Sequence, residues 1–219
     1  MRKIFVEPSL LSADFGAIAQ EVARVEAAGA DALHIDIMDG HFVPNFSLGP
    51  RVVAAVRRSC RLFLDVHLMI YNPFEYIEPF VKAGANRITI HVEAAENIEE
   101  TLRYIRSCNV ESGLAISPET SVSMLERYLP LCDLALLMTV EPGFGGQSFL
   151  PEVLEKIETL RGLASQMHME GLKIQVDGGI DDKTAPLCIQ AGADVLVSGT
   201  YLFSAPDMKV AIDRLRGGK

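Results

Sequence analysis

The chain has 219 residues, 49% hydrophobic and 22% charged, a composition typical of a folded globular protein rather than a disordered one. Its 29 acidic and 20 basic side chains give a formal net charge of −9, which argues against nucleic acid or an anionic membrane surface as a partner. No apolar run approaches the ~20 residues that span a bilayer. The four cysteines are widely spaced and indicate no disulfide framework, so we expect a cytoplasmic protein.

A short motif, Ala-Gly-Ala followed by Asp or Asn, recurs three times along the chain. Its copies begin at Ala28, Ala83 and Ala191, and each ends a helix-like stretch and precedes an apolar run. Glycine after the last helical residue supplies a left-handed C-terminal cap. The spacings are close to two and four repeats of about 27 residues, the length of one strand-plus-helix unit. Eight such units would fill the chain.

Eight apolar runs of strand length indicate buried parallel strands, with helical patterns between them. The predicted strands are 5–10, 33–38, 62–69, 88–93, 113–117, 134–140, 174–178 and 195–198, and clear helical patterns cover 15–27, 98–107, 150–164 and 184–190. We therefore predict one α/β domain over residues 1–219, a single (β/α)8 TIM barrel. An open doubly wound sheet is the alternative, but it would usually have fewer strands at this length. Active sites of such barrels lie where the strands end.

Polar side chains recur on the inward face of three predicted strands. His34 and Asp36 share one face because alternate residues of a strand point the same way, and the isoleucines between them face the helices. His67 on the third strand and Asp177 on the seventh are likewise on the inward face of their strands. Burying these imidazoles and carboxylates together is costly without a counter-charge. The four residues are therefore predicted to bind one divalent ion, zinc or iron(II), with manganese or cobalt as alternatives, while Asp65 orients His67.

Glycine-rich segments follow the last three predicted strands. They are Glu141–Gln147 (EPGFGGQ), Gly178-Gly179 and Ser198-Gly199-Thr200, and none contains Lys or Arg. An anion there would be bound by backbone N–H groups, which can operate in an acidic protein. Loops after the seventh and eighth strands are the usual phosphate site of these barrels. We predict a phosphate site, with Phe144 at the tip of a lid that excludes water.

Five other residues near the predicted strand ends are expected to border the site. Met38, Met69 and Met138 either fill packing gaps, as buried methionine commonly does, or form a soft lining beside a reactive anion. His91 and Glu93, at the end of the fourth strand, are expected to support the site rather than to act in it.

These motifs resemble those of the ribulose-phosphate 3-epimerase family. The similar segments are PSLLSAD from Pro8, HIDIMDGHFVPN from His34, DVHLM from Asp65, MTVEPGFGGQSF from Met138, VDGGI from Val176 and VSGT from Val197. They span nearly the full chain. The resemblance implies a barrel of the ribulose-phosphate-binding type. It also implies an isomerase of carbohydrate metabolism that interconverts D-ribulose 5-phosphate and D-xylulose 5-phosphate in the pentose phosphate pathway.

The resemblance assigns roles position by position. It places the metal ligands at His34, Asp36, His67 and Asp177, and the acid/base pair at Asp36 and Asp177. The implied substrate contacts are Ser9, His67, Asp177, Gly143, Phe144, Gly145, Gly146, Gly178, Gly179, Gly199 and Thr200. Thr200 stands where many members have Ser and keeps the hydroxyl, whereas Tyr201 replaces a smaller residue.

The chemistry of the implied reaction explains why two carboxylates are needed. Inverting a carbon beside a ketone requires removing a proton from one face and returning one to the other. We expect Asp36 to take the proton from ribulose 5-phosphate and Asp177 to deliver one to the opposite face, with the roles reversed for xylulose 5-phosphate. The metal is expected to stabilise the enediolate. The same motifs would suit a 3-epimerase of a hexulose 6-phosphate such as D-allulose 6-phosphate. A non-catalytic sugar-phosphate or metal-binding barrel is a further alternative, and we expect a homo-oligomer.

Overall fold

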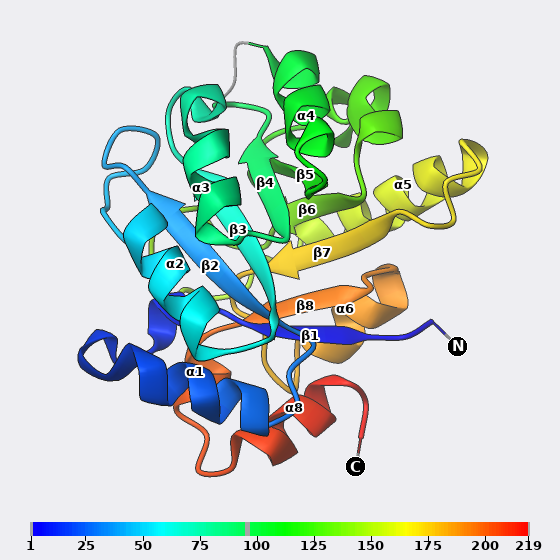
Figure 1. Ribbon diagram of the computed structural model, residues 1–219. Coiled ribbons are helices and arrows are strands. Elements are labelled where there is room, and N and C mark those ends of the chain that lie inside the picture. Colours follow the sequence, from blue (N-terminus) through cyan, green and yellow to red (C-terminus); the bar gives the residue numbers. More distant parts are fainter. Residues whose placement is uncertain (1, 95–96, 219) are drawn as a thin grey trace.

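The computed structural model describes residues 2–94 and 97–218 and consists of a parallel sheet surrounded by helices (Figure 1). The predicted domain, 1–219, also includes residues 1, 95–96 and 219, which lie outside the described part. The strands run in the order β1-β8-β7-β6-β5-β4-β3-β2, and a parallel bridge between Ser9 and His34 brings β1 beside β2. The predicted (β/α)8 barrel is therefore confirmed. The strands are β1 (Phe5–Pro8), β2 (Ala32–Met38), β3 (Phe63–Met69), β4 (Arg87–His91), β5 (Glu111–Ile116), β6 (Leu134–Met138), β7 (Lys173–Asp177) and β8 (Val195–Ser198).

Helices form the outer layer of the barrel. The α-helices are α1 (Ile18–Ala27), α2 (Pro50–Ser59), α3 (Ile77–Ala83), α4 (Ile98–Ser107), α5 (Val153–Gln166), α6 (Ala185–Ala191), α7 (Thr200–Phe203) and α8 (Met208–Leu215). Shorter 3₁₀ helices are η1 (Leu10–Ser12), η2 (Phe15–Ala17), η3 (Pro73–Tyr76), η4 (Val122–Met124) and η5 (Glu126–Leu131). Between β5 and β6 the outer layer consists of η4 and η5, and Pro130 within η5 lacks the N–H that an α-helix needs.

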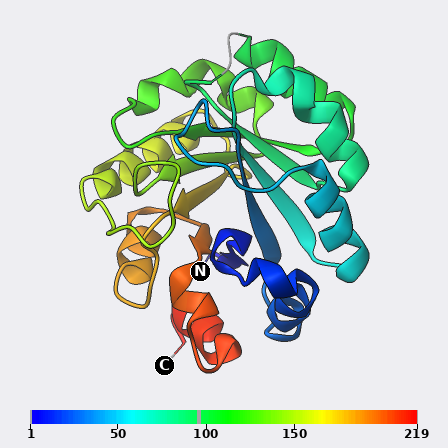
Figure 2. The ribbon, with the colours of Figure 1, turned by 90° about the vertical axis from the view of Figure 1, so that its left-hand side faces the viewer.

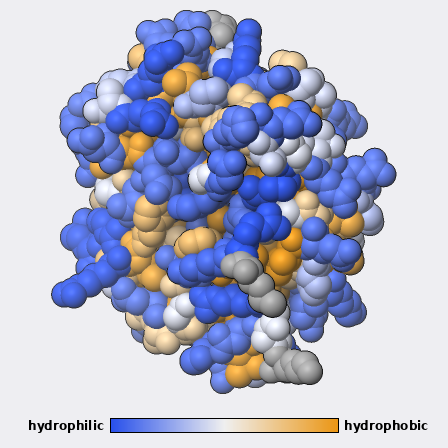
Figure 3. Space-filling model, turned by 90° about the vertical axis from the view of Figure 1, so that its right-hand side faces the viewer, coloured by the Kyte–Doolittle hydropathy of each residue, from blue (hydrophilic) through white to orange (hydrophobic). Residues whose placement is uncertain are grey.

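The two faces of the strands carry different side chains, as the alternation predicts. On β2, Leu33, Ile35 and Ile37 pack into the hydrophobic core beneath the helices, while His34 and Asp36 face the barrel interior. Figure 2 faces the end where the strands finish, and the blue loop after β2 and the yellow-green loop after β6 lie at this end. The opposite end, seen in Figure 3, is mostly hydrophilic with separate hydrophobic areas. Within the described residues, we find no helix with the length and hydropathy to cross a bilayer.

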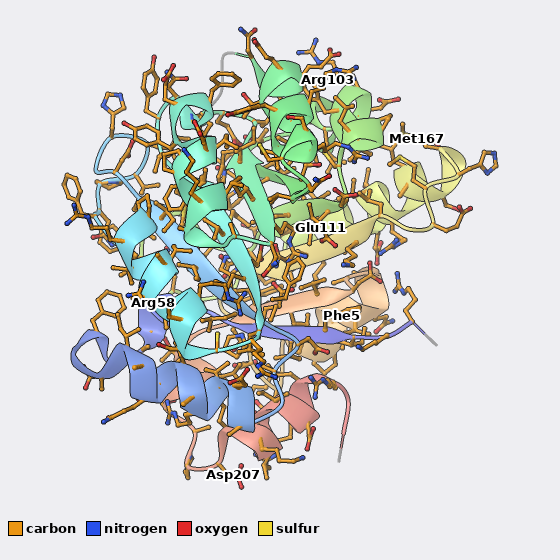
Figure 4. The ribbon with its side chains drawn as sticks, viewed as in Figure 1. Phe5, Arg58, Arg103, Glu111, Met167 and Asp207 are labelled. Carbon is orange, nitrogen blue, oxygen red and sulfur yellow. The ribbon has the colours of Figure 1, made fainter. Side chains whose placement is uncertain are left out.

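A layer of charged and polar side chains that was not predicted fills the barrel interior on the side where the strands begin. The fully buried Arg87 donates to both carboxylate oxygens of Glu7 at 2.9 Å and to Asp65 at 2.8 Å. Gln175 donates to the same two carboxylates at 2.7 and 2.8 Å. Burial raises the pKa of Glu7 to about 8 even though Arg87 lowers it. Glu111 (labelled in Figure 4), the first residue of β5, lies 3.4 Å from a third guanidinium nitrogen of Arg87.

The last residue of the repeated motif connects two neighbouring strands. Its side chain accepts from the N–H of a residue in the preceding odd-numbered strand, and its own N–H donates to the carbonyl of that same residue. The pairs are Asp31 with Val6, Asn86 with Leu64 and Asp194 with Ile174, and Asp133 binds Ser112 in the same way. The repeat therefore marks a unit of two strands, and four such units build the barrel. The first unit joins β1 to β2.

Replacing Asp31 with Ala tests this connection. The change leaves the Val6 N–H without its acceptor at 2.9 Å and removes the ion pair to Arg216. We expect the free energy of unfolding, measured by urea denaturation, to fall by about 1–3 kcal/mol. Asp31→Asn keeps the acceptor oxygen, as Asn86 does naturally, and should cost clearly less. Equal losses in the two variants would show that the ion pair, rather than the hydrogen bond, carries the effect.

Candidate active site

Strands β2, β3 and β7 bring the four predicted metal ligands together where the strands finish. One nitrogen or oxygen of each of His34, Asp36, His67 and Asp177 lies within 4.8 Å of the others. In the β2–β3 register, Asp36 stands beside His67. His34 and His67 are fully buried, whereas the Asp177 side chain is 14% exposed.

Both imidazoles point one ring nitrogen at the same carboxylates. His34 Nε2 lies 3.2 Å from Asp36 Oδ1 and 3.7 Å from Asp177 Oδ2. His67 Nδ1 lies 3.1 and 3.9 Å from those two oxygens. Two nitrogen and two oxygen donors thus converge, which is a ligand set that zinc and iron(II) accept. The residues present fit one divalent ion without any further side chain.

In each imidazole, the ring nitrogen that does not face Asp36 and Asp177 has a partner of its own. Asp65 was expected to orient His67, but its Oδ2 lies 2.7 Å from His34 Nδ1 instead. The strand register explains the difference, because Asp65 stands directly opposite His34 while His67 lies two residues further along β3. His67 Nε2 meets His91 Nε2 at 2.8 Å.

Ser9 connects β1 to this cluster. Its hydroxyl donates to Asp36 Oδ2 at 2.6 Å, while Asp36 Oδ1 faces the two imidazoles. Each oxygen of Asp36 therefore has a defined partner. Ser9 also lines the cavity above the cluster, where it was predicted to contact the substrate.

The protonation of these side chains is strongly coupled. Burial would raise the pKa of Asp36, but the charge of His34 and hydrogen bonds from both imidazoles hold it well below its usual range. Burial and the charge of Asp36 raise the pKa of Asp177 to about 7. Burial lowers the pKa of His67 to about 4. For His34 the carboxylates of Asp36 and Asp65 outweigh burial and raise its pKa well above the ordinary value.

A cavity of about 540 Å³ opens above the cluster. Met38, Met69 and Met138 are nearly buried and form part of its wall. Every glycine of the predicted phosphate site lines it, together with Phe144 and Thr200, and among the described residues no Lys or Arg does. Asn45 donates to the carbonyl of Gly143 at 2.7 Å and thereby joins the loops after β2 and β6.

Three of these glycines lie so close to neighbouring atoms that an added Cβ would collide with them. A Cβ at Gly178 would lie 2.4 Å from Val140, and one at Gly179 would lie 2.6 Å from the backbone nitrogen of Phe149. Both glycines also have positive φ values, +118° and +64°. A Cβ at Gly199 would lie 2.4 Å from Ser12 Oγ. The loops therefore expose backbone toward the cavity where side chains would fill it.

Several supporting residues were not identified from the sequence. Glu7, Arg87 and Gln175 form the charged layer beneath His34, and only the inward alternation of Gln175 with Asp177 hinted at such a layer. Ser12 also lines the cavity. It belongs to the PSLLSAD segment but carried no signal of its own.

Comparisons with known proteins identify a matching family and a matching fold. The family model described as "Ribulose-phosphate 3 epimerase family" matches residues 5–203. A ribulose-phosphate 3-epimerase from Chlamydia pneumoniae is 52% identical over 94% of this chain and 90% of its own length. A ribulose-phosphate 3-epimerase from Bacillus subtilis (strain 168) is 48% identical over 99% of this chain and 100% of its own length. The crystal structure of 3-keto-L-gulonate-6-phosphate decarboxylase from Vibrio cholerae O1 covers 99% of this chain and 97% of its own, with a TM-score of 0.72 at 16% identity, and supports the fold alone.

A metal ion at this cluster would compete with protons. His34 must lose its proton to offer Nε2, and Asp177, with a pKa of about 7, must be ionised. We expect Zn²⁺ affinity to rise from about pH 6 to about pH 8, by up to about tenfold per pH unit for each displaced proton. Isothermal titration calorimetry in buffers of different ionisation enthalpy would measure the proton release. Affinity independent of pH, with no proton release, would contradict this protonation scheme.

Proposed function

The chain belongs to the ribulose-phosphate 3-epimerase family, and we propose that it interconverts D-ribulose 5-phosphate and D-xylulose 5-phosphate, a step of the pentose phosphate pathway. The observation that carries the mechanism is the meeting of two carboxylates, Asp36 and Asp177, at one cation-binding cluster beneath a cavity lined by glycine loops. That arrangement offers an acid and a base to a single sugar carbon.

We assign His34, Asp36, His67 and Asp177 as ligands of one divalent metal ion, either zinc or iron(II), with manganese or cobalt as alternatives. When bound, the ion supplies positive charge beside the substrate carbonyl and its neighbouring hydroxyl and so stabilises the enediolate. The protein contributes the orientation of the ligands. Asp65 holds His34, and Ser9 holds the second oxygen of Asp36.

The two aspartates would serve opposite faces of carbon 3. They come from β2 and β7, which are separated by β1 and β8 around the barrel, so the carboxylates reach the cavity from different sides. Asp36 removes the proton of ribulose 5-phosphate and Asp177 returns one to the other face, with the roles exchanged for xylulose 5-phosphate. Met38, Met69 and Met138 border this position with side chains that offer no exchangeable proton.

The phosphate would be bound by the loops after β6, β7 and β8. Thr200 opens α7, and N–H groups in the first turn of a helix have no intrahelical acceptor. Neutral amide donors hold a dianion without a lysine, which suits a protein of net charge −9. The assigned contacts are Gly143, Phe144, Gly145, Gly146, Gly178, Gly179, Gly199 and Thr200, and Phe144, 53% exposed at the cavity rim, is the proposed tip of the lid.

We also propose that the enzyme acts in the cytoplasm and self-associates. The four cysteines are free thiols, which suits a reducing compartment. Phe46 and Tyr71 are 78% and 51% exposed, and a second copy would cover such apolar side chains.

The phosphate assignment can be tested with Gly199→Ala. Gly199 has φ −100°, so Ala would not have to adopt a left-handed conformation, but its Cβ would displace Ser12 at the cavity wall. We expect KM for ribulose 5-phosphate to rise about tenfold or more, from the loss of roughly 1.4 kcal/mol of binding. Gly162→Ala in α5 is the matched control, because nothing lies within 4 Å of its added Cβ. Unchanged KM in Gly199→Ala would argue against the phosphate site.

The two-base mechanism predicts different defects in Asp36→Asn and Asp177→Asn. Each should lower epimerisation at least about 100-fold. In D₂O, Asp177→Asn should still exchange the C3 hydrogen of ribulose 5-phosphate but not that of xylulose 5-phosphate, and Asp36→Asn should show the reverse. Proton NMR measures the exchange, and metal analysis of each variant controls for loss of the ion. Near-normal turnover in either metal-loaded variant would refute the assignment.

A further inference from the structure

The two metal-binding imidazoles are supported in different ways. His34 Nδ1 meets the Asp65 carboxylate directly, at 2.7 Å. His67 Nε2 meets His91 Nε2 at 2.8 Å, and His91 Nδ1 then lies 3.1 Å from Glu93 Oε2. On its Nε2 side, His67 thus reaches the Glu93 carboxylate through an intervening imidazole, whereas its Nδ1 faces Asp36 directly.

The imidazole rings of His67 and His91 meet nearly edge to edge. The ring centroids of His67 and His91 are 5.0 Å apart, the ring planes are inclined by 24°, and the two Nε2 atoms are only 2.8 Å apart. Nitrogens this much closer than the centroids indicate that the ring edges, rather than the ring faces, meet. Face-to-face stacking would leave no direction for an in-plane hydrogen bond, whereas this geometry allows one. Both rings are fully buried, and Phe42 packs against His91 with centroids 4.9 Å apart.

The hydrogen-bond pattern determines which nitrogen carries hydrogen. One of two facing Nε2 atoms must donate and the other must accept. If His67 offers the lone pair of Nδ1 to a metal ion, its hydrogen lies on Nε2. His91 then accepts at Nε2, carries its own hydrogen on Nδ1 and donates it to Glu93. With an ion at Nδ1 of His67, this arrangement would give each nitrogen of the two rings a partner.

Glu93 is fixed in turn by the loop after β5. Its Oε1 accepts from the Ser117 N–H at 2.8 Å and from Thr120 Oγ1 at 2.5 Å. Burial opposes ionisation, yet the hydrogen bonds from His91, Thr120 and Ser117 lower the pKa of Glu93 to about 2. Lys156 of α5 donates to the carbonyl of Thr120 at 2.8 Å and so holds this loop against the barrel. The carboxylate is therefore a fixed acceptor.

We propose that His91 and Glu93 are positioning residues that orient the His67 ring and fix its tautomer, so that Nδ1 faces the metal ion. They do for His67 what Asp65 does for His34. This inference rests on the proposed metal site, and neither residue touches the substrate in the proposed mechanism.

The test compares three variants of the full chain. His91→Leu removes the acceptor for His67, His91→Gln retains a carbonyl acceptor, and Glu93→Gln removes the negative charge while keeping the shape. Thr89→Val is the matched control. Thr89 lies two residues earlier on the same face of β4, it is fully buried, and its hydroxyl has no hydrogen-bond partner in the part of the chain that the structure describes.

Three measurements report on the ligand rather than on turnover. Titration of the metal-free protein gives Zn²⁺ affinity, the visible spectrum of the Co²⁺ form reports ligand geometry, and ¹⁵N NMR of the Zn²⁺ form shows which His67 nitrogen carries hydrogen. We expect His91→Leu to weaken Zn²⁺ binding about 10–100-fold and to alter the Co²⁺ spectrum. Glu93→Gln should show a smaller loss, His91→Gln should restore most of the affinity, and Thr89→Val should match wild type.

The outcomes separate this inference from the proposed function. Wild-type protein that binds no divalent ion would overturn both. Wild-type protein that binds Zn²⁺ through His67 Nε2, with hydrogen on Nδ1, would overturn the positioning role alone. So would His91→Leu with wild-type affinity and Co²⁺ spectrum. If His91→Leu does not fold, the NMR result on wild type and the affinity of Glu93→Gln still decide, because either hydrogen on His67 Nδ1 or unchanged affinity in Glu93→Gln overturns the inference.

Discussion

The meeting of two carboxylates and two imidazoles inside a nearly dry barrel end is the constraint that organises this protein. Ionised groups lose much of their hydration there, so each needs a fixed partner or a cation. Asp36 satisfies this need most fully, since one oxygen faces both imidazoles and the other accepts from Ser9. Among residues 2–94 and 97–218, Asp177 has no comparably close partner, and it is the more exposed carboxylate, which leaves it open toward the cavity.

The interior of the barrel is arranged in layers that support one another. Arg87 donates to Glu7 and compensates the charge of Asp65, and Asp65 in turn holds His34. A buried ion network of this kind contributes little net stability, because desolvation offsets most of the attraction. Its value here is orientation: it holds the His34 ring while the hydrophobic core between strands and helices supplies the stability.

The glycine loops that line the cavity are the proposed phosphate site, and they contribute no charged side chain of Lys or Arg among the described residues. Glycine loops after β6, β7 and β8 bring backbone close to the cavity, and Cβ atoms at Gly178, Gly179 and Gly199 would collide with their neighbours. Amide donors are held by the fold and need no counter-ion when the site is empty. In the proposed mechanism, such donors would let an acidic protein bind a sugar phosphate without a lysine, and a metal ion would add positive charge only at the reacting end of the substrate.

Local sequence patterns predicted the eight strands, the inward faces of three of them, the four candidate ligands and the glycine loops. These features follow from alternation along a strand and from the conformations open to glycine, both of which are local. The tertiary structure was needed to show that Asp65 contacts His34 rather than His67, that His67 contacts His91 and His91 contacts Glu93, and that Arg87 joins Glu7 to Asp65. Those contacts depend on the register between strands, which is set by closure of the whole barrel and by packing between residues distant in the chain.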